Sequence, residues 1–296
     1  MTRVCAAIHP VTGARCVGRT PFLMRRLLLL PFLPCLLLSC APAGSSAPSM
    51  PEVTPQSRAV VLPIDAVAWA PLNPARGDAS PRAANLWGDR TTPGATGFLV
   101  RFADGFASPP HIHNVSYRAV ALQGWVHNDD PEAAPMWMEP GSFWTQPRGE
   151  AHITAARGEG STVLAYVEIE EGPYLVRPAA DAVEGPERAL NIDASNLVWV
   201  ETNGVRVAYL WGNPEVHHGV FVKVPAGSTA QLQAISGPLR AVVVAGTPTH
   251  PEPLPVGSLL TAEAGPAVVD CAADADCVFY VRSEGTLEVS ASARES

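Results

Sequence analysis

The sequence predicts an all-β protein built from two similar domains in tandem. Short stretches of alternating apolar and polar residues, such as Phe98, Val100 and Phe102, are separated by clusters of Gly, Pro, Asn and Asp, which is the pattern of strands and turns. Beyond residue 57 no 3.6-residue apolar period persists over a helical length. Each half therefore has the signature of a β-sandwich or β-barrel.

An internal repeat indicates that the two domains are copies of one unit. The segment 86–89 (Leu-Trp-Gly-Asp) recurs at 210–213 (Leu-Trp-Gly-Asn), and the segment 97–102 recurs at 219–224. Such self-similarity over the length of a domain decides the architecture more firmly than local propensity does. The spacing between equivalent residues shrinks along the chain, which indicates shorter loops in the second copy.

The N-terminal segment predicts export. Two arginines follow Met24, an apolar run occupies residues 27–38, and the run ends in Leu-Ser-Cys at Cys40. This pattern resembles a bacterial lipoprotein signal, in which the cysteine is lipidated and becomes the first residue of the mature chain. We expect residues 1–39 to be the signal peptide, with Met24 as the suspected start of translation, and Cys40 to carry the lipid. An ordinary cleaved signal with an incidental Cys40 is the alternative.

The segment that follows predicts a flexible tether. Residues 41–56 are dominated by Ala, Pro and Ser and contain one acid, a composition that cannot bury enough apolar surface to fold. We therefore expect residues 40–57 to hold the protein on the bacterial cell envelope through the lipid alone, facing the periplasm or the cell surface.

The charge balance argues against a nucleic-acid partner. The chain has 20 Lys and Arg against 28 Asp and Glu, a net charge of −8. An acidic surface of this kind repels a polyanion. With 47% hydrophobic and 16% charged residues, both halves can form real cores rather than a disordered acidic tail.

The cysteines predict one disulfide. Three of the six lie within the expected signal peptide, which leaves Cys271 and Cys277 as a pair beside Cys40. The two are separated by Ala-Ala-Asp-Ala-Asp, a polar stretch suited to the tip of a hairpin. In an oxidising compartment such a pair forms a disulfide. A two-cysteine metal site is the weaker alternative, because no His or third Cys lies near in sequence.

Two glycine-anchored stretches of the first copy contain the residues that carry chemistry. The first stretch contains His-x-His and the second ends in a single His. In order, their defining residues are Gly105, His111, His113, Tyr117 and Gly124, and then Gly141, Pro147, Gly149 and His152.

The three histidines predict a metal site. His111 and His113 are two residues apart, so on a strand they point to the same face, and His152 can join them from a later strand. Three imidazoles suit Zn, Fe, Ni, Co, Mn or Cu. Because the three ligands are neutral, they leave the charge of the metal uncompensated and an anion is expected beside it.

Several groups could supply that anion. Tyr117 could bind as a phenolate if its pKa were lowered from about 10, and Glu150 lies two residues before His152. A hydroxide or the substrate itself could also serve. We expect Glu150 near the metal as a ligand, supporting group or general base, and Tyr117 lining the pocket, and we treat both as candidate catalytic residues.

These two stretches resemble the paired motifs of the cupin superfamily, with matching Gly, Pro and His spacings. Tyr117 stands where the family usually has Glu, and Ala156 where the second motif often ends in Asn. The duplicated layout is most similar to the ChrR-like cupins and to a related two-cupin family of unknown function. The resemblance implies two tandem double-stranded β-helix (jelly-roll-like) barrels: a metal-binding cupin domain at 58–180 and a degenerate one at 181–296.

The second copy is expected to lack the metal site. At the positions equivalent to His111, His113, Tyr117 and His152 we expect Gln233, Ile235, Leu239 and Val268. The glycines of the turns are retained, so they serve the fold in both halves. The second barrel is therefore expected to be filled, with a structural role or a role in forming a homodimer.

Together these features predict an exported lipoprotein that binds one divalent metal, Zn or Fe before Mn or Ni. The resemblance implies a metal-dependent enzyme such as a dioxygenase, acting on a small anionic or oxygen-rich molecule through Lewis-acid polarisation or O₂ activation. The alternatives are a non-catalytic Zn-dependent ligand-binding or sensing module and a structural envelope protein. Because fold alone does not set function, metal content is the most informative measurement.

Overall fold

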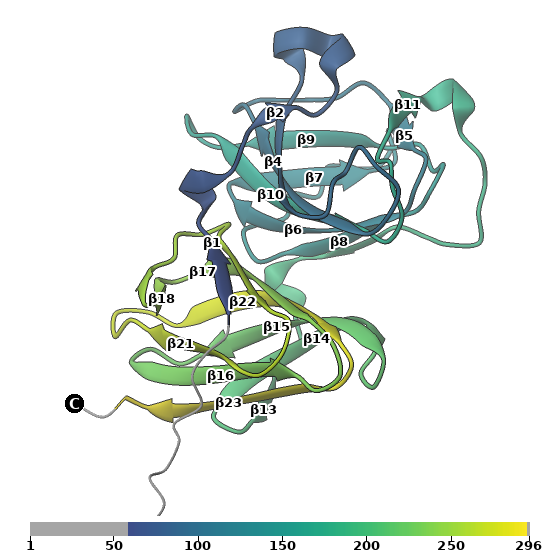
Figure 1. Cartoon of the computed structure of the whole chain (residues 1–296). Helices are drawn as coiled ribbons and strands as arrows, with labels where there is room; N and C mark the ends of the chain where they lie inside the picture. The colour runs from purple at the N-terminus through teal and green to yellow at the C-terminus, as the bar shows by residue number, and fades with distance from the viewer. Residues whose placement is uncertain (1–58, 295–296) are drawn as a thin grey trace, which may run out of the picture. The chain divides into compact units, whose positions relative to one another are not determined.

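The computed structural model describes residues 59–294, and their regular structure is almost entirely β. The predicted fold class is confirmed: two tandem double-stranded β-helix barrels occupy this part of the chain (Figure 1). The only helices described are four short 3-10 turns, at Ile64–Ala66, Pro74–Ala79, Ala179–Asp181 and Ala194–Asn196. None of them is long and apolar enough to span a bilayer. The expected signal peptide, Cys40 and the tether lie outside the described residues.

The first barrel is built on one seven-stranded antiparallel sheet with the order β12-β8-β6-β10-β4-β3-β2, together with two small ladders, β11-β5 and β7-β9. Its strands are β2 (Ala70–Pro71), β3 (Arg82–Trp87), β4 (Thr96–Phe102), β5 (His111–His113), β6 (Tyr117–Gln123), β7 (Trp125–Asp129), β8 (Phe143–Gln146), β9 (Ile153–Arg157), β10 (Val163–Ile169), β11 (Val176–Pro178) and β12 (Leu190–Ile192).

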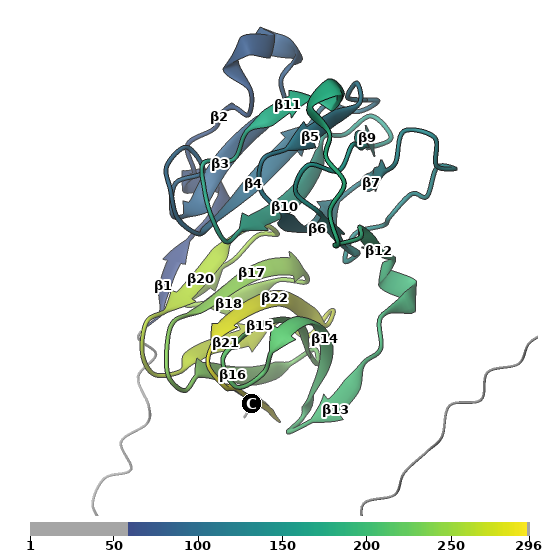
Figure 2. The ribbon, with the colours of Figure 1, turned by 90° about the vertical axis from the view of Figure 1, so that its right-hand side faces the viewer.

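The second barrel pairs a seven-stranded sheet with the order β1-β20-β17-β22-β15-β14-β13 with a five-stranded sheet, β19-β18-β21-β16-β23 (Figure 2). Its strands are β1 (Val60–Leu62), β13 (Val200–Thr202), β14 (Val205–Asn213), β15 (His217–Val224), β16 (Ser228–Ala234), β17 (Leu239–Ala245), β18 (Pro248–His250), β19 (Glu252–Pro253), β20 (Leu259–Ala262), β21 (Ala267–Cys271), β22 (Cys277–Glu284) and β23 (Leu287–Ala293).

Each barrel takes one edge strand from the other half of the sequence. β1 pairs with β20 of the second barrel, and β12 pairs with β8 of the first. The turns after these strands are held alike, because the backbone N–H of Ile64 donates to Ser258 Oγ (3.2 Å) and that of Ala194 donates to Ser142 Oγ (3.0 Å). The expected division at residue 180 therefore does not follow the sheets, since the leading strand of each repeat closes an open edge of the other copy.

The two large sheets also share a hydrophobic core. Each barrel has its own buried interior, and a third cluster joins the outward faces of the two sheets. This shared cluster includes Leu99 and Tyr166 from the first sheet and Phe221 and Tyr280 from the second, all at most 1% exposed. The two barrels are thus held together by apolar burial as well as by exchanged strands.

A buried ion pair lies within this shared core. Glu168 on β10 is fully buried and accepts hydrogen bonds from the hydroxyls of Tyr166 (3.1 Å) and Tyr280 (2.7 Å). Arg282 on β22 lies 3.6 Å from the Glu168 carboxylate. Burial raises the pKa of Glu168, and the neighbouring Arg282 cation opposes that rise. Both charges are satisfied by partners, which buried charges require.

The repeated Leu-Trp-Gly motif supports this pair from both sides. Trp87 Nε1 donates to the Tyr166 hydroxyl at 3.0 Å, and Trp211 Nε1 donates to the Tyr280 hydroxyl at 2.9 Å. A side chain at Gly97 would overlap the Trp87 ring. The two copies of the Leu-Trp-Gly motif therefore lie at the polar centre of the interface between the barrels. The repeat in the sequence did not indicate this position.

Replacing Arg282 by Leu is expected to lower the free energy of unfolding by about 3 kcal/mol, because it removes the nearer of the two cations beside the buried Glu168 and leaves only Arg118, at 3.8 Å. Urea denaturation measures the loss. Arg188→Leu is the matched control: Arg188 is exposed and donates only to the backbone carbonyls of Gly185 and Glu187, so a change within about 0.5 kcal/mol is expected. Equal losses in the two variants would contradict the role given to Arg282.

Candidate metal centre

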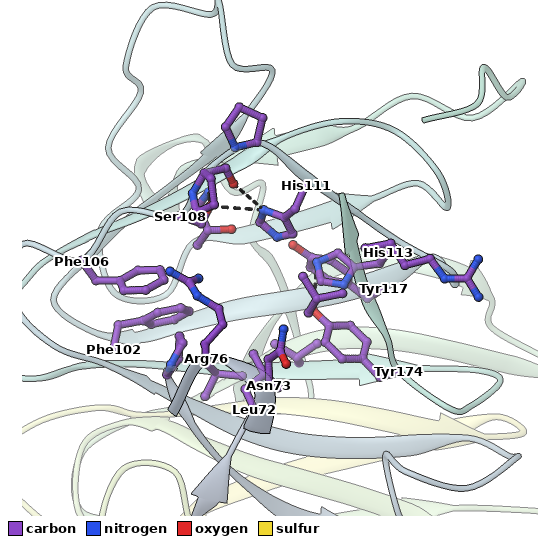
Figure 3. Close-up of a pocket in the computed structure, with 18 of the residues that line it drawn as sticks. Leu72, Asn73, Arg76, Phe102, Phe106, Ser108, His111, His113, Tyr117 and Tyr174 are labelled. Atoms are coloured by element: carbon purple, nitrogen blue, oxygen red, sulfur yellow. Dashed lines mark hydrogen bonds between the residues drawn. The ribbon is translucent and has the colours of Figure 1, made fainter. Parts of the chain in front are cut away.

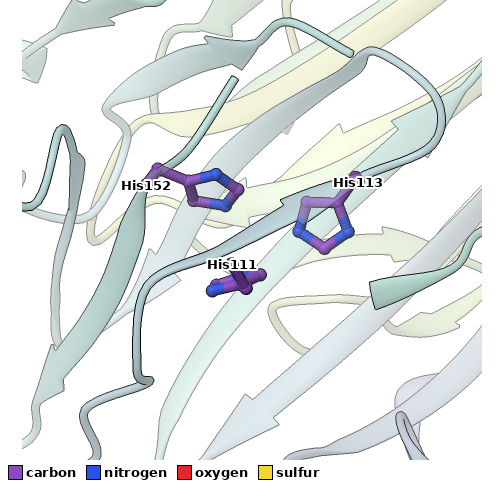
Figure 4. A group of neighbouring side chains, drawn as sticks. All are labelled: His111, His113 and His152. Carbon is purple, nitrogen blue, oxygen red and sulfur yellow. The ribbon is translucent and has the colours of Figure 1, made fainter. Parts of the chain in front are cut away.

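The structure brings the three predicted histidines together inside the first barrel (Figure 4). Their candidate ligand atoms all lie within 4.8 Å of one another. His111 and His113 begin and end β5, and an antiparallel bridge joins His111 to His152 through reciprocal backbone hydrogen bonds of 3.0 Å. The ring centroids of His111 and His152 are 4.3 Å apart. Among the described residues this is the one such group of histidine, cysteine or carboxylate side chains.

Each of these imidazoles is oriented by a backbone carbonyl on its Nδ1 side. Nδ1 lies 3.0 Å from the Pro109 carbonyl in His111, 3.3 Å from the Leu175 carbonyl in His113 and 3.2 Å from the Glu150 carbonyl in His152. A protonated Nδ1 that donates to the carbonyl leaves the Nε2 lone pair available, which is the usual arrangement of metal-binding histidines.

The Nε2 atoms fit a metal ion. His152 Nε2 is buried and has no hydrogen-bond partner among the described residues. Burial, reinforced by the neighbouring His111, lowers the pKa of His152 to about 3. Burial likewise lowers the pKa of His111 and takes the pKa of His113 well below its ordinary value. The rings are therefore neutral near pH 7, as imidazole ligands must be.

The Glu150 side chain does not join the group of histidines. Its contribution to the site is its backbone carbonyl, which faces His152 Nδ1 and also accepts a hydrogen bond from Gln146 Nε2 (3.3 Å). A shared strand face with His152 is not formed, because β9 begins only at Ile153. The Glu150 Oε2 atom is buried and has no hydrogen-bond partner among the described residues, and the expected role of Glu150 as a ligand, supporting group or general base stays a prediction.

Tyr117 lines the pocket, as expected, but in a setting that favours the neutral phenol. Its hydroxyl donates to Asn128 Oδ1 at 3.0 Å, and Asn128 is held in turn by Gln146 (2.8 Å) and Thr154 (2.8 Å). Burial raises the pKa of Tyr117, against which the hydrogen bond from Trp144 acts weakly. These contacts do not support the phenolate alternative.

Tyr174 is a site residue that the sequence analysis missed. Its hydroxyl lies 3.2 Å from His113 Nε2, and its ring stacks on the imidazole with a centroid distance of 4.5 Å and an interplanar angle of 23°. It comes from the segment between β10 and β11, 61 residues beyond His113. No signal in either glycine-anchored stretch points to it, because only the pairing of β11 with β5 places this segment against the histidines.

A cavity of about 440 Å³ opens beside His111 and His113 (Figure 3), within the usual range for small-molecule sites. Much of its lining is apolar. These residues include Leu72, Val100, Phe102, Phe106, Trp144, Ala165 and Val167. The lining also includes polar side chains, among them Ser108, which hydrogen-bonds with His111 Nδ1 (3.2 Å). The arrangement is that of a ligand pocket with the histidines at its wall.

Apolar side chains occupy the equivalent place in the second barrel, but three of the four expected residues, all except Leu239, were wrong by one position. Leu232 pairs with Ala267 on the rung that corresponds to His111 and His152, and Leu232, Ala234 and Ala267 are in the core. Between Ala107 and His111 the first barrel has one extra residue relative to the facing segment 152–155. This bulge shifts the register, so Gln233 and Ile235 point outward, and Leu239 alone keeps its expected inward place.

The other predicted cysteine and histidine positions are also placed. Cys271 and Cys277 form a disulfide between the end of β21 and the start of β22. Four further histidines of the part of the chain that the structure describes lie on strands. They are His127 on β7, His217 and His218 on β15, and His250 on β18.

Comparisons with known proteins show the fold. A family model described as Domain of unknown function (DUF4437) matches residues 60–290. A protein from Nostoc punctiforme PCC 73102 named "putative dioxygenase" is 13% identical with a TM-score of 0.58, over 83% of this chain and 90% of that chain. Vicilin from Corylus avellana (hazelnut) is 11% identical with a TM-score of 0.54, over 77% of this chain and 87% of that chain.

The 7S globulin of Momordica charantia is 10% identical with a TM-score of 0.52, over 77% of this chain and 85% of that chain. A search of curated proteins finds no match. At these identities the likeness shows the fold alone, and membership of the cupin superfamily stays a prediction. The narrower similarity to the ChrR-like cupins stays a prediction.

Replacing Tyr174 by Phe is expected to raise the affinity for Zn²⁺ by about 3-fold to 10-fold. The hydroxyl must leave His113 Nε2 before that nitrogen can bind an ion, and a hydrogen bond contributes roughly 1 kcal/mol. Competition with a chromophoric chelator measures the affinity, and Tyr209→Phe, on the half-exposed side of β14, is the control. Weaker binding would contradict this and identify the Tyr174 hydroxyl as a ligand.

Proposed function

The chain belongs to the DUF4437 family, and from this premise we propose that it is a metal-dependent cupin enzyme with one divalent ion in its first barrel. The observation that carries the proposal is the convergence of three neutral imidazoles whose Nδ1 atoms face backbone carbonyls, beside an apolar cavity. His111, His113 and His152 would hold the ion through Nε2. Zn or Fe fits this donor set best, and Mn or Ni would also be accepted.

The reaction we propose is oxygenation of a small anionic or oxygen-rich molecule. A divalent ion with three imidazole ligands supplies Lewis-acid polarisation or O₂ activation at its remaining coordination positions. The chain contributes the orientation of the three rings, and the apolar lining excludes water from the reacting groups. Tyr117 and Tyr174 both border the histidines; the Tyr117 hydroxyl is committed to Asn128, whereas the Tyr174 hydroxyl, once displaced from His113 Nε2, can donate a hydrogen bond to a bound oxygen atom. The name of the Nostoc protein is compatible with this reaction.

Metal analysis tests the site. We expect about one equivalent of Fe or Zn in full-length protein purified without chelator, and loss of that metal in His152→Ala. His217→Ala is the control, since His217 lies on β15 near Glu170 and Glu284 and outside the group of three. Full metal occupancy in His152→Ala would overturn the assignment.

Oxygen uptake then separates the two functions of the metal. Fe together with O₂ consumption in the presence of a substrate supports the dioxygenase. Stoichiometric Zn without O₂ consumption would instead support the non-catalytic binding module.

We also propose that the protein is exported and anchored to the bacterial envelope through Cys40. The proposal is supported by the sequence of residues 24–40 and by the Cys271–Cys277 disulfide, a bond typical of oxidising compartments. Mass spectrometry of the mature protein is expected to show an N-terminal Cys40 bearing acyl chains, and Cys40→Ser should remain unlipidated. An unmodified mature N-terminus would contradict the anchor.

A further inference from the structure

We propose that the cavity beside the three histidines binds a carboxylate with an apolar body about the size of one aromatic ring, and that Arg76 pairs with the carboxylate. This inference rests on the proposed function and names its ligand class. Four observations carry it: the charge of the cavity lining, the free guanidinium of Arg76, an insertion present only in the first repeat, and the apolar shape of the remaining wall.

The lining of the cavity has cations but no acid. Of its residues none is Asp or Glu, whereas Arg76 and Arg177 both contribute. The sign of the charge around the cavity is therefore opposite to the net charge of the chain, which is −8. A divalent ion on three neutral imidazoles would add two further positive charges. Uncompensated charge in a partly buried site is costly, so the ligand that completes the site must be an anion.

Arg76 is available to pair with that anion. Its side chain takes part in no ion pair and no hydrogen bond recorded among residues 59–294, unlike Arg118 or Arg282, which both contact carboxylates. The exposed Arg76 side chain lines the same cavity as Phe102, Phe106 and His111, and Figure 3 shows it beside the two phenylalanine rings. A guanidinium presents parallel donors that match a carboxylate. Arg76 can therefore hold the carboxylate while the rest of the ligand lies towards the histidines.

The segment that carries Arg76 occurs only in the repeat that has the site. Trp69 and Trp87 are 18 residues apart, whereas their equivalents Trp199 and Trp211 are 12 apart, a difference of six. In the second barrel the corresponding strands β13 and β14 are joined by the tight turn at 203–204. The second barrel, whose interior is filled, thus lacks the insertion, whereas the first barrel, which contains the cavity, has it.

The inserted turn is tied in place by its own hydrogen bonds. The backbone N–H of Asn73 bonds to Ser80 Oγ at 2.9 Å, and the Asn73 side chain accepts from the backbone N–H of Ala75 at 3.1 Å. These contacts close the base of the 3-10 segment Pro74–Ala79. Arg76 is therefore presented by a defined turn, which reduces the entropy lost on binding.

The remaining wall selects the body of the ligand. Leu72, Val100, Phe102, Phe106 and Val167 form the apolar part of the lining, and the polar side chains lie beside it at residues such as Asn73, Ser108 and Thr154. A volume of about 440 Å³ lies in the range of small-molecule sites and has room for one aromatic ring with a short acidic side chain. The chemical class is therefore an arylalkyl carboxylate.

The test uses the full-length, Zn-loaded protein and a matched pair of probes, 3-phenylpropionate and its neutral amide. Isothermal titration calorimetry is expected to show the acid binding at least about 10-fold more tightly than the amide. Arg76→Gln should remove most of that preference while amide binding and Zn content stay unchanged, and Arg76→Lys should restore part of it. Arg188→Gln, an exposed arginine outside the cavity, should behave as the wild type.

The outcomes separate this inference from the proposed function. Wild-type protein that holds no metal would overturn the proposed function itself. Wild-type protein that holds metal but binds the acid and the amide equally would overturn only the ligand class. A preference for the acid that persists in Arg76→Gln, with the variant folded by thermal denaturation, would overturn the role of Arg76.

Discussion

The contact between the outward faces of the two large sheets is the constraint on which the rest of the structure depends. Leu99, Tyr166, Phe221 and Tyr280 are withdrawn from water there, around the Glu168–Arg282 pair. Because this burial stabilises both barrels at once, the first barrel need not fill its own interior completely. An empty cavity in an isolated small barrel would cost stability. Here the filled second barrel and the shared hydrophobic core stabilise the first barrel. The first barrel can therefore keep the cavity beside the three histidines.

The interface also explains why the two copies differ. Glu168 and Arg282 occupy equivalent positions of the two repeats, 114 residues apart, as do Tyr166 and Tyr280. Two identical copies related by a two-fold axis would place like charges against each other at this point, which is unfavourable in a buried site. Divergence after duplication permits the opposite charges. The same divergence allowed one copy to lose its imidazoles and close its interior with Leu232, Ala234 and Ala267.

Sequence reasoning recovered the features that depend on local spacing and missed those that depend on pairing between distant segments. The all-β class and the Cys271–Cys277 bond follow from short-range patterns, whereas the tandem barrels and the grouping of His111, His113 and His152 follow from the internal repeat and from the resemblance of two motifs to a known family. The exchange of β1 and β12 cannot be read locally, because nothing in a three-residue strand says which sheet receives it. Tyr174 was missed for the same reason, because only the pairing of β11 with β5 brings it to the histidines. The one-residue shift in the second copy came from assuming a regular strand where the backbone of the first copy carries an extra residue.

The exchanged strands make the duplicated chain a single unit that cannot be divided without loss. A polypeptide cut at residue 180 would give two pieces, each lacking the strand that closes its main sheet, while β1 and β12 would each remain on the wrong piece. Open edges of this kind recruit strands from other molecules. The severed halves would therefore complement one another in trans or associate with further copies of themselves, so selection on either barrel acts on both.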